Sequence, residues 1–259
     1  MPNIGPLEER KPIIEVKALY KSFAGNAVLR GADLDVREGT TMVVLGGSGS
    51  GKTVLMKHVI GLLKPDRGKV EVDGVEITAL EGKALTEARQ RFGMVFQGAA
   101  LFDSMTVLEN VAFPLRERRG RKVSSAEIRG RVVEKLAVVD LGEEVLERWP
   151  SELSGGMRKR VALARALVSE PRIVLYDEPT TGLDPITTEY VDEMIIHARE
   201  RLGITSMVIS HDIASAFRVA DRVGVLYDGH LAAMGTPAEV RSSPDPFVQK
   251  FLSTWFAKQ

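Results

Sequence analysis

The feature that most constrains the fold of this chain is a glycine-rich run between residues 46 and 53. The run reads Gly46-Gly47-Ser48-Gly49-Ser50-Gly51-Lys52-Thr53 and matches the phosphate-binding loop pattern Gly-x-x-x-x-Gly-Lys-Ser/Thr without a mismatch. It follows an apolar, strand-like run at 42–45 and precedes a helix-like run at 54–60. A flexible Gly/Ser linker is the alternative, but a linker has no reason to end in Lys-Thr or to lie between a strand and a helix. The strand–loop–helix order therefore predicts a phosphate site.

The chemistry of such a site assigns roles to the residues of the loop. Glycines let the backbone curl so that several N–H groups point at one anion, and the start of a helix adds positive potential at the same place. We expect Lys52 to reach the β- and γ-phosphates of a nucleotide and Thr53 to place its hydroxyl on Mg²⁺. The remaining predicted phosphate ligands are Gly46, Ser48, Gly49, Ser50 and Gly51.

Composition restricts the class of protein. The 259 residues suffice for one large α/β domain or two small ones. Lys+Arg and Asp+Glu both number 35, so no basic field favours a nucleic-acid partner. The absence of cysteine excludes a disulfide scaffold and a cysteine metal site. Neither a run of roughly 20 apolar residues nor the apolar core of a signal peptide is found, so we expect a soluble chain whose membrane role would come through a partner.

The first third of the chain shows β patterning on both sides of the loop. Residues 1–12 are polar, contain proline, and are expected to be poorly ordered. Short strands are predicted at 13–19, 27–29 and 34–36, and Asp73-Gly74 predicts a tight hairpin turn between 69–72 and 75–77. These strands indicate an antiparallel sheet beside the loop strand. Phe23 lies among them and is either a core aromatic or a platform on which an adenine ring stacks.

A helical segment follows the next apolar strand. The run at 92–96 ends in Gln97, an amide that could point at Mg²⁺ or a water, although a lone Gln is normally a surface residue. Thr106 with Glu109, and Ser124 with Glu127, match capping boxes, and the segment from 98 to about 150 is predicted to be helical. The basic run at 116–122 is interpreted as a solvated loop.

Polar groups then follow two further apolar patterns. Ser154-Gly155-Gly156 at the start of a predicted helix has the physics of a second anion site, although it is also a common loop sequence. Asp177 and Glu178 end the apolar run at 173–176, where two adjacent acids are costly without a counter-charge such as a Mg²⁺–nucleotide. We expect Asp177 to hold the metal through its water shell and Glu178 to act as general base towards a water.

The last third of the chain adds two candidates and a tail. Asp184 before Pro185 is a good helix N-cap, which explains both residues structurally. His211 closes the strand predicted at 205–210 and could share a sheet edge with Glu178, although such a His is more often structural. The tail carries a helical apolar stripe that either docks on its own domain or contacts a partner. Its members are Phe247, Phe251, Leu252, Trp255 and Phe256.

The order of these motifs resembles that of the ATP-binding subunits of ABC transporters. The resemblance runs from about residue 13 to 240 and implies an α/β fold of the P-loop NTPase type. Such a fold has a RecA-like core with a parallel sheet, an antiparallel β subdomain and an inserted α-helical subdomain, here at about 98–165. Residues 1–12 and 241–259 would be tails on the domain at 13–240.

The resemblance also implies ATP and Mg²⁺ as cofactors and a role for each matching residue. Phe23 matches the aromatic residue that stacks on adenine, residues 46–53 the Walker A motif, and Gln97 the Q-loop. Ser154, Gly155 and Gly156 match the signature motif, Asp177 and Glu178 the Walker B motif, Asp184 the D-loop and His211 the switch histidine. Glu178, His211 and Lys52 are then the catalytic candidates, and Thr53, Gln97 and Asp177 the metal candidates. The family implies a head-to-tail homodimer, with each ATP between one chain's phosphate loop and the other chain's signature motif.

Three departures from the family pattern point to a subgroup: Met157 in place of Gln, the doubled glycine at 46–47, and Val54 after Thr53. Together with the segments 97–107 and 109–115, this pattern resembles that of ATPases that work with MCE-domain lipid-binding proteins in phospholipid transport. That resemblance implies a membrane permease, an MCE-type protein and possible accessory subunit as partners, no nucleic acid, and a place at the cytoplasmic side of the inner membrane.

Other functions remain open at this level. Amino-acid and phosphate importers have similar sequences in the same region. A soluble ABC-type ATPase without a permease usually carries a coiled-coil insertion or two cassettes, and neither pattern is found here. A non-catalytic nucleotide-binding subunit is disfavoured by the presence of Glu178 and His211.

Overall fold

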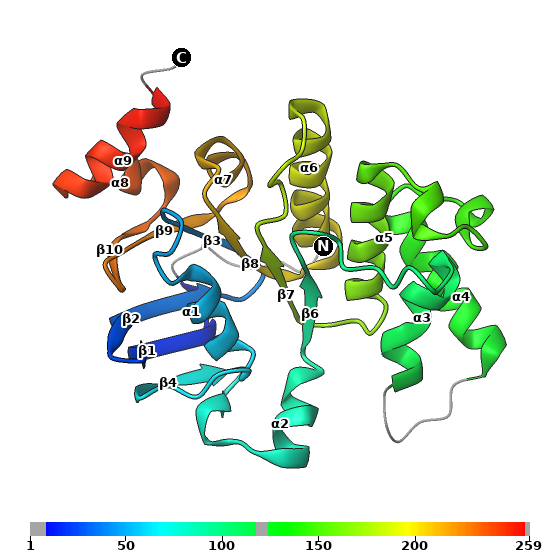
Figure 1. Cartoon of the computed structure of the whole chain (residues 1–259), viewed down its shortest axis with the longest axis horizontal. Helices are drawn as coiled ribbons and strands as arrows, with labels where there is room; N and C mark the ends of the chain where they lie inside the picture. Colours follow the sequence, from blue (N-terminus) through cyan, green and yellow to red (C-terminus); the bar gives the residue numbers. More distant parts are fainter. Residues whose placement is uncertain (1–8, 118–123, 257–259) are drawn as a thin grey trace.

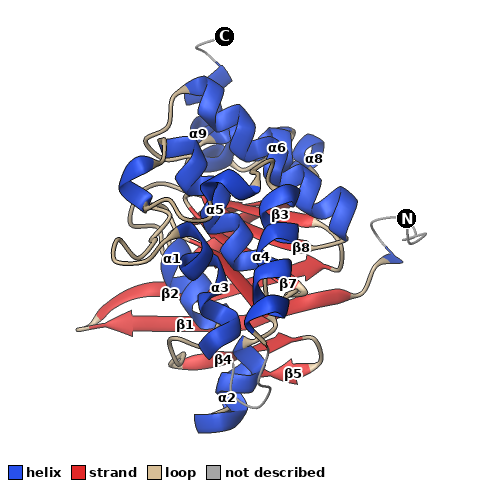
Figure 2. Ribbon diagram, turned by 90° about the vertical axis from the view of Figure 1, so that its right-hand side faces the viewer, coloured by secondary structure: helices blue, strands red, loops and turns tan. Residues whose placement is uncertain are grey.

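Two β-sheets form the centre of the molecule (Figures 1 and 2). The structure, a computed structural model, describes residues 9–117 and 124–256, with side chains described as far as Ser253. One sheet is four-stranded and antiparallel, in the order β2-β1-β4-β5. The other is six-stranded, in the order β10-β9-β3-β8-β7-β6.

The elements alternate along the chain in the manner of an α/β protein. The strands are β1 Pro12–Phe23, β2 Asn26–Arg37, β3 Thr41–Leu45, β4 Arg67–Val72, β5 Val75–Glu76, β6 Phe92–Val95, β7 Ile173–Asp177, β8 Thr205–Ser210, β9 Arg222–Tyr227 and β10 His230–Gly235. The helices are α1 Lys52–Val59, α2 Gly82–Arg89, α3 Val107–Glu117, α4 Ser125–Val138, α5 Gly155–Leu167, α6 Pro185–Leu202, α7 Ile213–Val219, α8 Pro237–Arg241 and α9 Pro246–Phe256. Short 3₁₀ turns occur at Ile77–Ala79, Glu143–Val145 and Pro150–Glu152.

The six-stranded sheet has the parallel core that the apolar runs predict. β3, β6, β7, β8 and β9 pair in parallel, and β10 returns antiparallel to β9. Every residue of β3 and β8 is buried, as expected for parallel strands covered on both faces. Because parallel strands end at one edge of a sheet, the residues that follow β3, β7 and β8 gather there.

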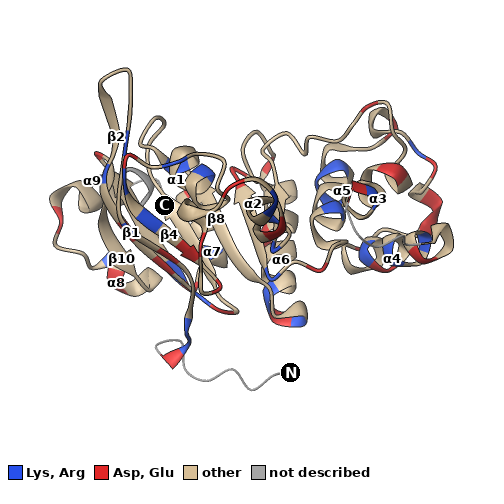
Figure 3. Cartoon of the chain, turned by 90° about the horizontal axis from the view of Figure 1, so that it is seen from below, with Lys and Arg blue, Asp and Glu red and all other residues tan. Residues whose placement is uncertain are grey.

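The predicted helical segment lies at one end of the molecule, beyond β6 and away from the antiparallel sheet (Figure 1). α3 and α4 pack against α5, and their buried side chains continue into the core beneath β7. The capping box of α3 is confirmed, because Thr106 N–H donates to Glu109 and Glu109 N–H donates to Thr106. Basic and acidic residues are interspersed on α4, whereas the charged residues of α5 are all basic (Figure 3).

The predicted hairpin turn at Asp73-Gly74 is confirmed. Both residues have positive φ, 51° and 72°, which defines the primed turn that matches the twist of two strands. Asp228-Gly229 repeats the geometry between β9 and β10, with φ of 44° and 80°.

Two local predictions differ from the structure. The strands expected at 27–29 and 34–36 are one continuous strand, β2, whose pairing with β1 contains bulges that interrupt the apolar alternation. Helix α2 was not expected, because its eight residues are too few for a helical period to be recognised, and Ala88 is its single buried residue.

The C-terminal helix packs on its own fold in its first two turns. The ring of Phe247 stacks on Tyr227 with centroids 3.5 Å apart, and Val248 and Leu252 are buried. The side chains of Trp255 and Phe256 lie outside the described residues, as do residues 1–8 and most of the basic run, 118–123. In the described part of the chain, no helix has both the length and the apolar character needed to span a membrane.

Candidate active site

The phosphate loop leaves β3 after Leu45 and enters α1 at Lys52. Gly51 is the N-cap of α1 with φ of 102°, a left-handed conformation that favours glycine. A Cβ on Gly46 would lie 2.6 Å from the carbonyl oxygen of Leu226, so this position has no room for a side chain. The two glycines are therefore required for different reasons, one for its backbone angle and one for close approach.

The side chain of Lys52 lies inside this loop. Its ammonium is buried and donates to the carbonyls of Gly46, at 2.8 Å, and Gly47, at 3.1 Å. The hydroxyl of Ser50 is buried without a hydrogen-bond partner. Because buried donors are normally paired, a curled loop with a central cation and an unpaired hydroxyl is suited to an anion such as a phosphate.

The carboxylate of Glu178 lies at the centre of the polar groups at the sheet edge. Its Oε1 is 3.6 Å from Lys52 Nζ, and its Oε2 is 2.7 Å from His211 Nδ1. Thr181 Oγ1 donates to the same Oε2 at 3.1 Å. The structure thus brings together the three predicted catalytic residues, which are far apart in the chain.

The backbone of Glu178 is itself unusual. Its φ is 50°, in the left-handed region that costs a non-glycine residue on the order of 1–3 kcal/mol. The N–H of Glu178 donates to Ile209 O at 2.9 Å, which ties the residue to β8. Strained residues of this kind cluster at functional sites.

Asp177, the last residue of β7, lies beside this group. Burial, and secondarily the charge of Glu178, raise the pKa of its carboxyl, while Lys57, Lys52 and a hydrogen bond with Thr53 act in the opposite direction. A half-buried carboxylate next to a hydroxyl provides the hard oxygen ligands that Mg²⁺ prefers. Among the described residues, no group of three or more His, Cys, Asp or Glu side chains is placed to hold a metal ion.

Gln97 follows β6 in an exposed loop next to β7. Its backbone carbonyl accepts a hydrogen bond from Lys159, and the carbonyls of Ala99 and Ala100 accept from Arg165 at 2.8 and 2.7 Å. The loop is therefore held by helix α5. The role of the Gln97 side chain as a ligand of Mg²⁺ stays a prediction.

The predicted signature residues form a separate group. Ser154 caps α5 by accepting from Met157 N–H at 3.2 Å. With Gly155, Gly156 and Asp184 it lines a hollow of about 540 Å³. Figures 1 and 3 show α5 well apart from α1, so one chain does not place this hollow against its own phosphate loop.

Asp184 and Phe23 are also resolved. Asp184 caps α6 as predicted, accepting from Thr187 N–H at 3.0 Å. Phe23 is 43% exposed at the end of β1, with the Lys21 ammonium 5.5 Å from its ring centroid. Phe23 is thus not a core aromatic, and the platform interpretation stays a prediction.

Sequence reasoning missed Lys159, Arg165 and Thr181. The two cations lie on a helix with a plain apolar pattern, and their burial depends on a loop more than 60 residues away. Thr181 could have been found, because a hydroxyl three residues after an acid often bonds locally.

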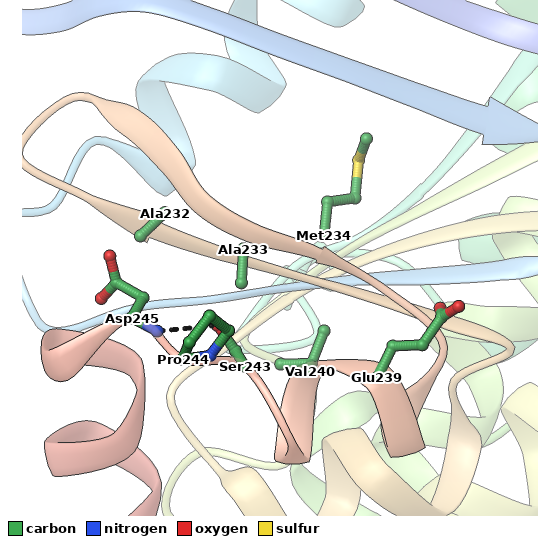
Figure 4. Close-up of a pocket in the computed structure, with 8 residues that line it drawn as sticks. All are labelled: Ala232, Ala233, Met234, Glu239, Val240, Ser243, Pro244 and Asp245. Carbon is green, nitrogen blue, oxygen red and sulfur yellow. Dashed lines mark hydrogen bonds between the residues drawn. The ribbon is translucent and has the colours of Figure 1, made fainter.

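Another hollow, of about 490 Å³, lies where β10 meets α8 and the turn before α9 (Figure 4). Ala232, Ala233 and Met234 line one side, and Glu239 and Asp245 lie at its borders. It contains none of the predicted site residues.

A phosphate loop joined to a Glu–His pair at the edge of a parallel sheet, with an inserted helical layer, defines a nucleotide-hydrolysing cassette. The family model described as "ABC transporter" matches residues 29–181. The chain belongs to this family and is an ATPase.

Curated relatives cover nearly the whole chain. It is 44% identical over 240 residues to the "Probable ribonucleotide transport ATP-binding protein mkl" of Mycobacterium leprae, covering 93% of this chain and 68% of the relative. It is 41% identical to the sulfate/thiosulfate import ATP-binding protein CysA of Xylella fastidiosa, covering 92% and 68%. It is 40% identical to protein TRIGALACTOSYLDIACYLGLYCEROL 3, chloroplastic, of Arabidopsis thaliana, covering 93% and 73%. The chain thus spans about two thirds of the length of several of these relatives.

Solved cassettes share the fold. The dimeric post-hydrolysis structure of the cassette MJ0796 with ADP and Pi is 33% identical, with a TM-score of 0.77, covering 86% of this chain and 98% of that one. The structure of cbiO1 from Clostridium perfringens is 30% identical, with a TM-score of 0.82, covering 95% and 96%. The predicted fold class is confirmed, and cassettes of this family work as dimers with membrane permease subunits.

Proposed function

We propose that Glu178, His211 and Lys52 carry out ATP hydrolysis in this chain. An ionised carboxylate only accepts hydrogen bonds, so His211 contributes its Nδ1–H to Glu178 and holds the carboxylate in place. Glu178 then takes a proton from the attacking water, and Lys52 stabilises negative charge on the phosphates. The observation that carries the proposal is the position of Glu178, within 3.6 Å of Lys52 and 2.7 Å of His211.

Thr53, Asp177 and Gln97 would hold Mg²⁺. The metal, when bound, would neutralise charge on the phosphates. The hydrogen bond between Thr53 and Asp177 keeps two of the three oxygen ligands together.

The separation of the two anion sites supports a head-to-tail homodimer. The phosphate loop of one copy would face Ser154, Gly155 and Gly156 of the other, with Asp184 at the same interface. Binding of ATP to both surfaces would then close the dimer, and hydrolysis would open it.

We propose that the membrane permease contacts the loop after Gln97. A hollow of about 400 Å³ lies beside this loop and is lined mainly by apolar side chains, several of them exposed. The aromatic members are Phe92, Phe96, Phe102 and Phe113. A movement of Gln97 would shift a permease segment bound in this hollow. Hydrolysis would be coupled to transport in this way.

We propose further that the transported molecule is a lipid. The chain would act at the cytoplasmic side of the inner membrane, with an MCE-type protein and a small accessory subunit as partners. The supporting observation is the subgroup pattern, Met157 with the segments 97–107 and 109–115. The 40% identity to a plant protein named after a galactolipid is in keeping with it. An importer of a small solute is the second candidate, since a sulfate/thiosulfate import protein is equally similar.

The test is a pull-down with tagged Glu178→Gln protein and ATP from detergent-solubilised membranes. Bound proteins are identified by mass spectrometry and bound lipid by extraction. We expect a permease, an MCE-type protein and phospholipid. A permease with a solute-binding protein would favour the importer, and no membrane protein would favour a soluble ATPase.

A further inference from the structure

The loop after Gln97 has a backbone that needs external support. Ala99 and Ala100 have φ of 63° and 49°, so two consecutive alanines occupy the left-handed region. Each such residue costs on the order of 1–3 kcal/mol and persists only when its surroundings hold it.

Two buried cations of α5 provide this support. Lys159 donates to the Gln97 carbonyl, and Arg165 donates to the carbonyls of Ala99 and Ala100. Lys159 is 7% exposed and Arg165 is 8% exposed, and burial lowers the pKa of both side chains. In the part of the chain that the structure describes, no carboxylate lies within ion-pair distance of Lys159.

A buried ammonium bonded to a carbonyl, without a counter-ion, is an expensive way to stabilise a fold. What it achieves here is a link between two distant parts of the site. Lys159 lies five residues after Ser154 on α5, which is a continuous helix between the sheet and α3 (Figure 1). Its head group donates to the carbonyl of Gln97, the second residue after β6.

We propose that Lys159 is a positioning residue for ATP hydrolysis, which ties the signature end of α5 to the backbone of Gln97. Movement of Ser154–Gly156 against a partner copy is then transmitted to the Gln97 side chain. Arg165 keeps Ala99 and Ala100 in the conformation that lets the loop turn. The inference rests on the roles proposed above for Gln97 and for the signature residues.

Lys135 is a matched control for the loss of a buried lysine. It is also 7% exposed and lies on α4, but its ammonium pairs with Glu134 at 2.6 Å and Glu170 at 3.5 Å. Lys135→Met therefore removes a similar side chain from the same helical layer without touching Gln97.

The experiment measures steady-state ATP hydrolysis by the full chain and four variants: Lys159→Met, Lys135→Met, Gln97→Ala and the double variant Lys159→Met/Gln97→Ala. We expect Lys159→Met to lower kcat about tenfold because Gln97 is misplaced, with little change in KM for ATP because the phosphate loop is untouched. Lys135→Met should keep wild-type kcat. The double variant should be no slower than Gln97→Ala, because Lys159 acts through Gln97.

Several outcomes would overturn the inference. One is a double variant whose fold-reduction in kcat equals the product of the reductions in the two single variants. Another is an equal loss of kcat in Lys159→Met and Lys135→Met. If Lys159→Met fails to fold, Lys159→Arg replaces it, and protease cleavage of the loop measures whether the larger head group has displaced Gln97. Wild-type kcat in a Lys159→Arg variant with a displaced loop would count against positioning. Wild-type kcat in Gln97→Ala would remove the role of Gln97 and this inference with it. None of these assays uses permease or lipid, so failure of the lipid proposal is a separate result.

Discussion

At the residue scale, Glu178 lies between Lys52 and His211, so a variant without its charge tests the proposed base. We expect Glu178→Gln to bind ATP, because Lys52 and the phosphate loop are unchanged. Turnover should fall about 10²–10⁴-fold, because an amide cannot accept the proton of the attacking water. Single-turnover hydrolysis and equilibrium nucleotide binding measure the two effects separately.

Glu189→Gln is a suitable control for that variant. Glu189 is an exposed acid on α6 that pairs with Arg218 at 2.8 Å, so the same chemical change is made away from the phosphate loop. Its turnover should equal that of the wild type. Glu178→Gln turning over at the wild-type rate would remove Glu178 from the role of base.

At the scale of elements, the contact between α6 and α7 contains an acid that the mechanism does not use. Asp192 is 2% exposed, accepts a hydrogen bond from Ser215, and lies 3.9 Å from Arg218. Burial raises the pKa of its carboxyl to about 6, with Asp212 and Glu189 nearby and Ser215 and Arg218 opposing. The α6–α7 contact is thus sensitive to pH in the weakly acidic range.

The sign of this dependence follows from linkage. The folded state holds the proton of Asp192 more tightly than the unfolded state, so this residue's contribution to stability declines as pH rises from about 4 to about 6. Asp192→Asn should remove that decline and raise the free energy of unfolding at pH 7.5 by on the order of 2 kcal/mol. Urea denaturation at pH 4.5, 6 and 7.5 measures it.

His58 also makes the stability of the fold depend on pH. Burial lowers the pKa of its imidazole, so His58 destabilises the fold as the pH falls below the ordinary pKa of histidine. This dependence has the opposite direction to that of Asp192. The difference between wild type and Asp192→Asn cancels the effect of His58. A variant less stable than wild type at pH 7.5, with the same pH slope, would contradict the assignment.

At the scale of the whole molecule, Gly155 tests the head-to-tail dimer. A Cβ on Gly155 would meet nothing closer than 4.0 Å, and Glu in the first turn of a helix interacts favourably with its dipole. We expect Gly155→Glu to fold with wild-type stability but to lose ATP-dependent dimerisation, because the new carboxylate would face the partner's bound phosphates. Analytical ultracentrifugation in the Glu178→Gln background measures dimerisation with and without ATP.

The interpretation of Gly155→Glu depends on a control at the same helix start. Met157→Gln changes a neighbouring side chain without adding charge and should still dimerise. ATP-driven dimers of Gly155→Glu would show that this surface is not the interface.

Much of the fold could be predicted because it depends on neighbouring residues. The Asp73-Gly74 turn, the Asp184 cap and the glycine loop before Lys52 are each specified within a few positions of chain. α2 could not be predicted, because a helix of eight residues is shorter than the roughly 11–18 residues over which a helical period is recognised.

The sequence by itself determined a phosphate-loop ATPase with an inserted helical segment, since those motifs are local and their order is specific. Only the tertiary structure decided which residues share a site. The sheet order β3-β8-β7 places Lys52, Glu178 and His211 together, and the packing of α5 against the β6 loop buries Lys159 against Gln97. Contacts between residues far apart in the chain depend on sheet order and helix packing, which no local pattern contains.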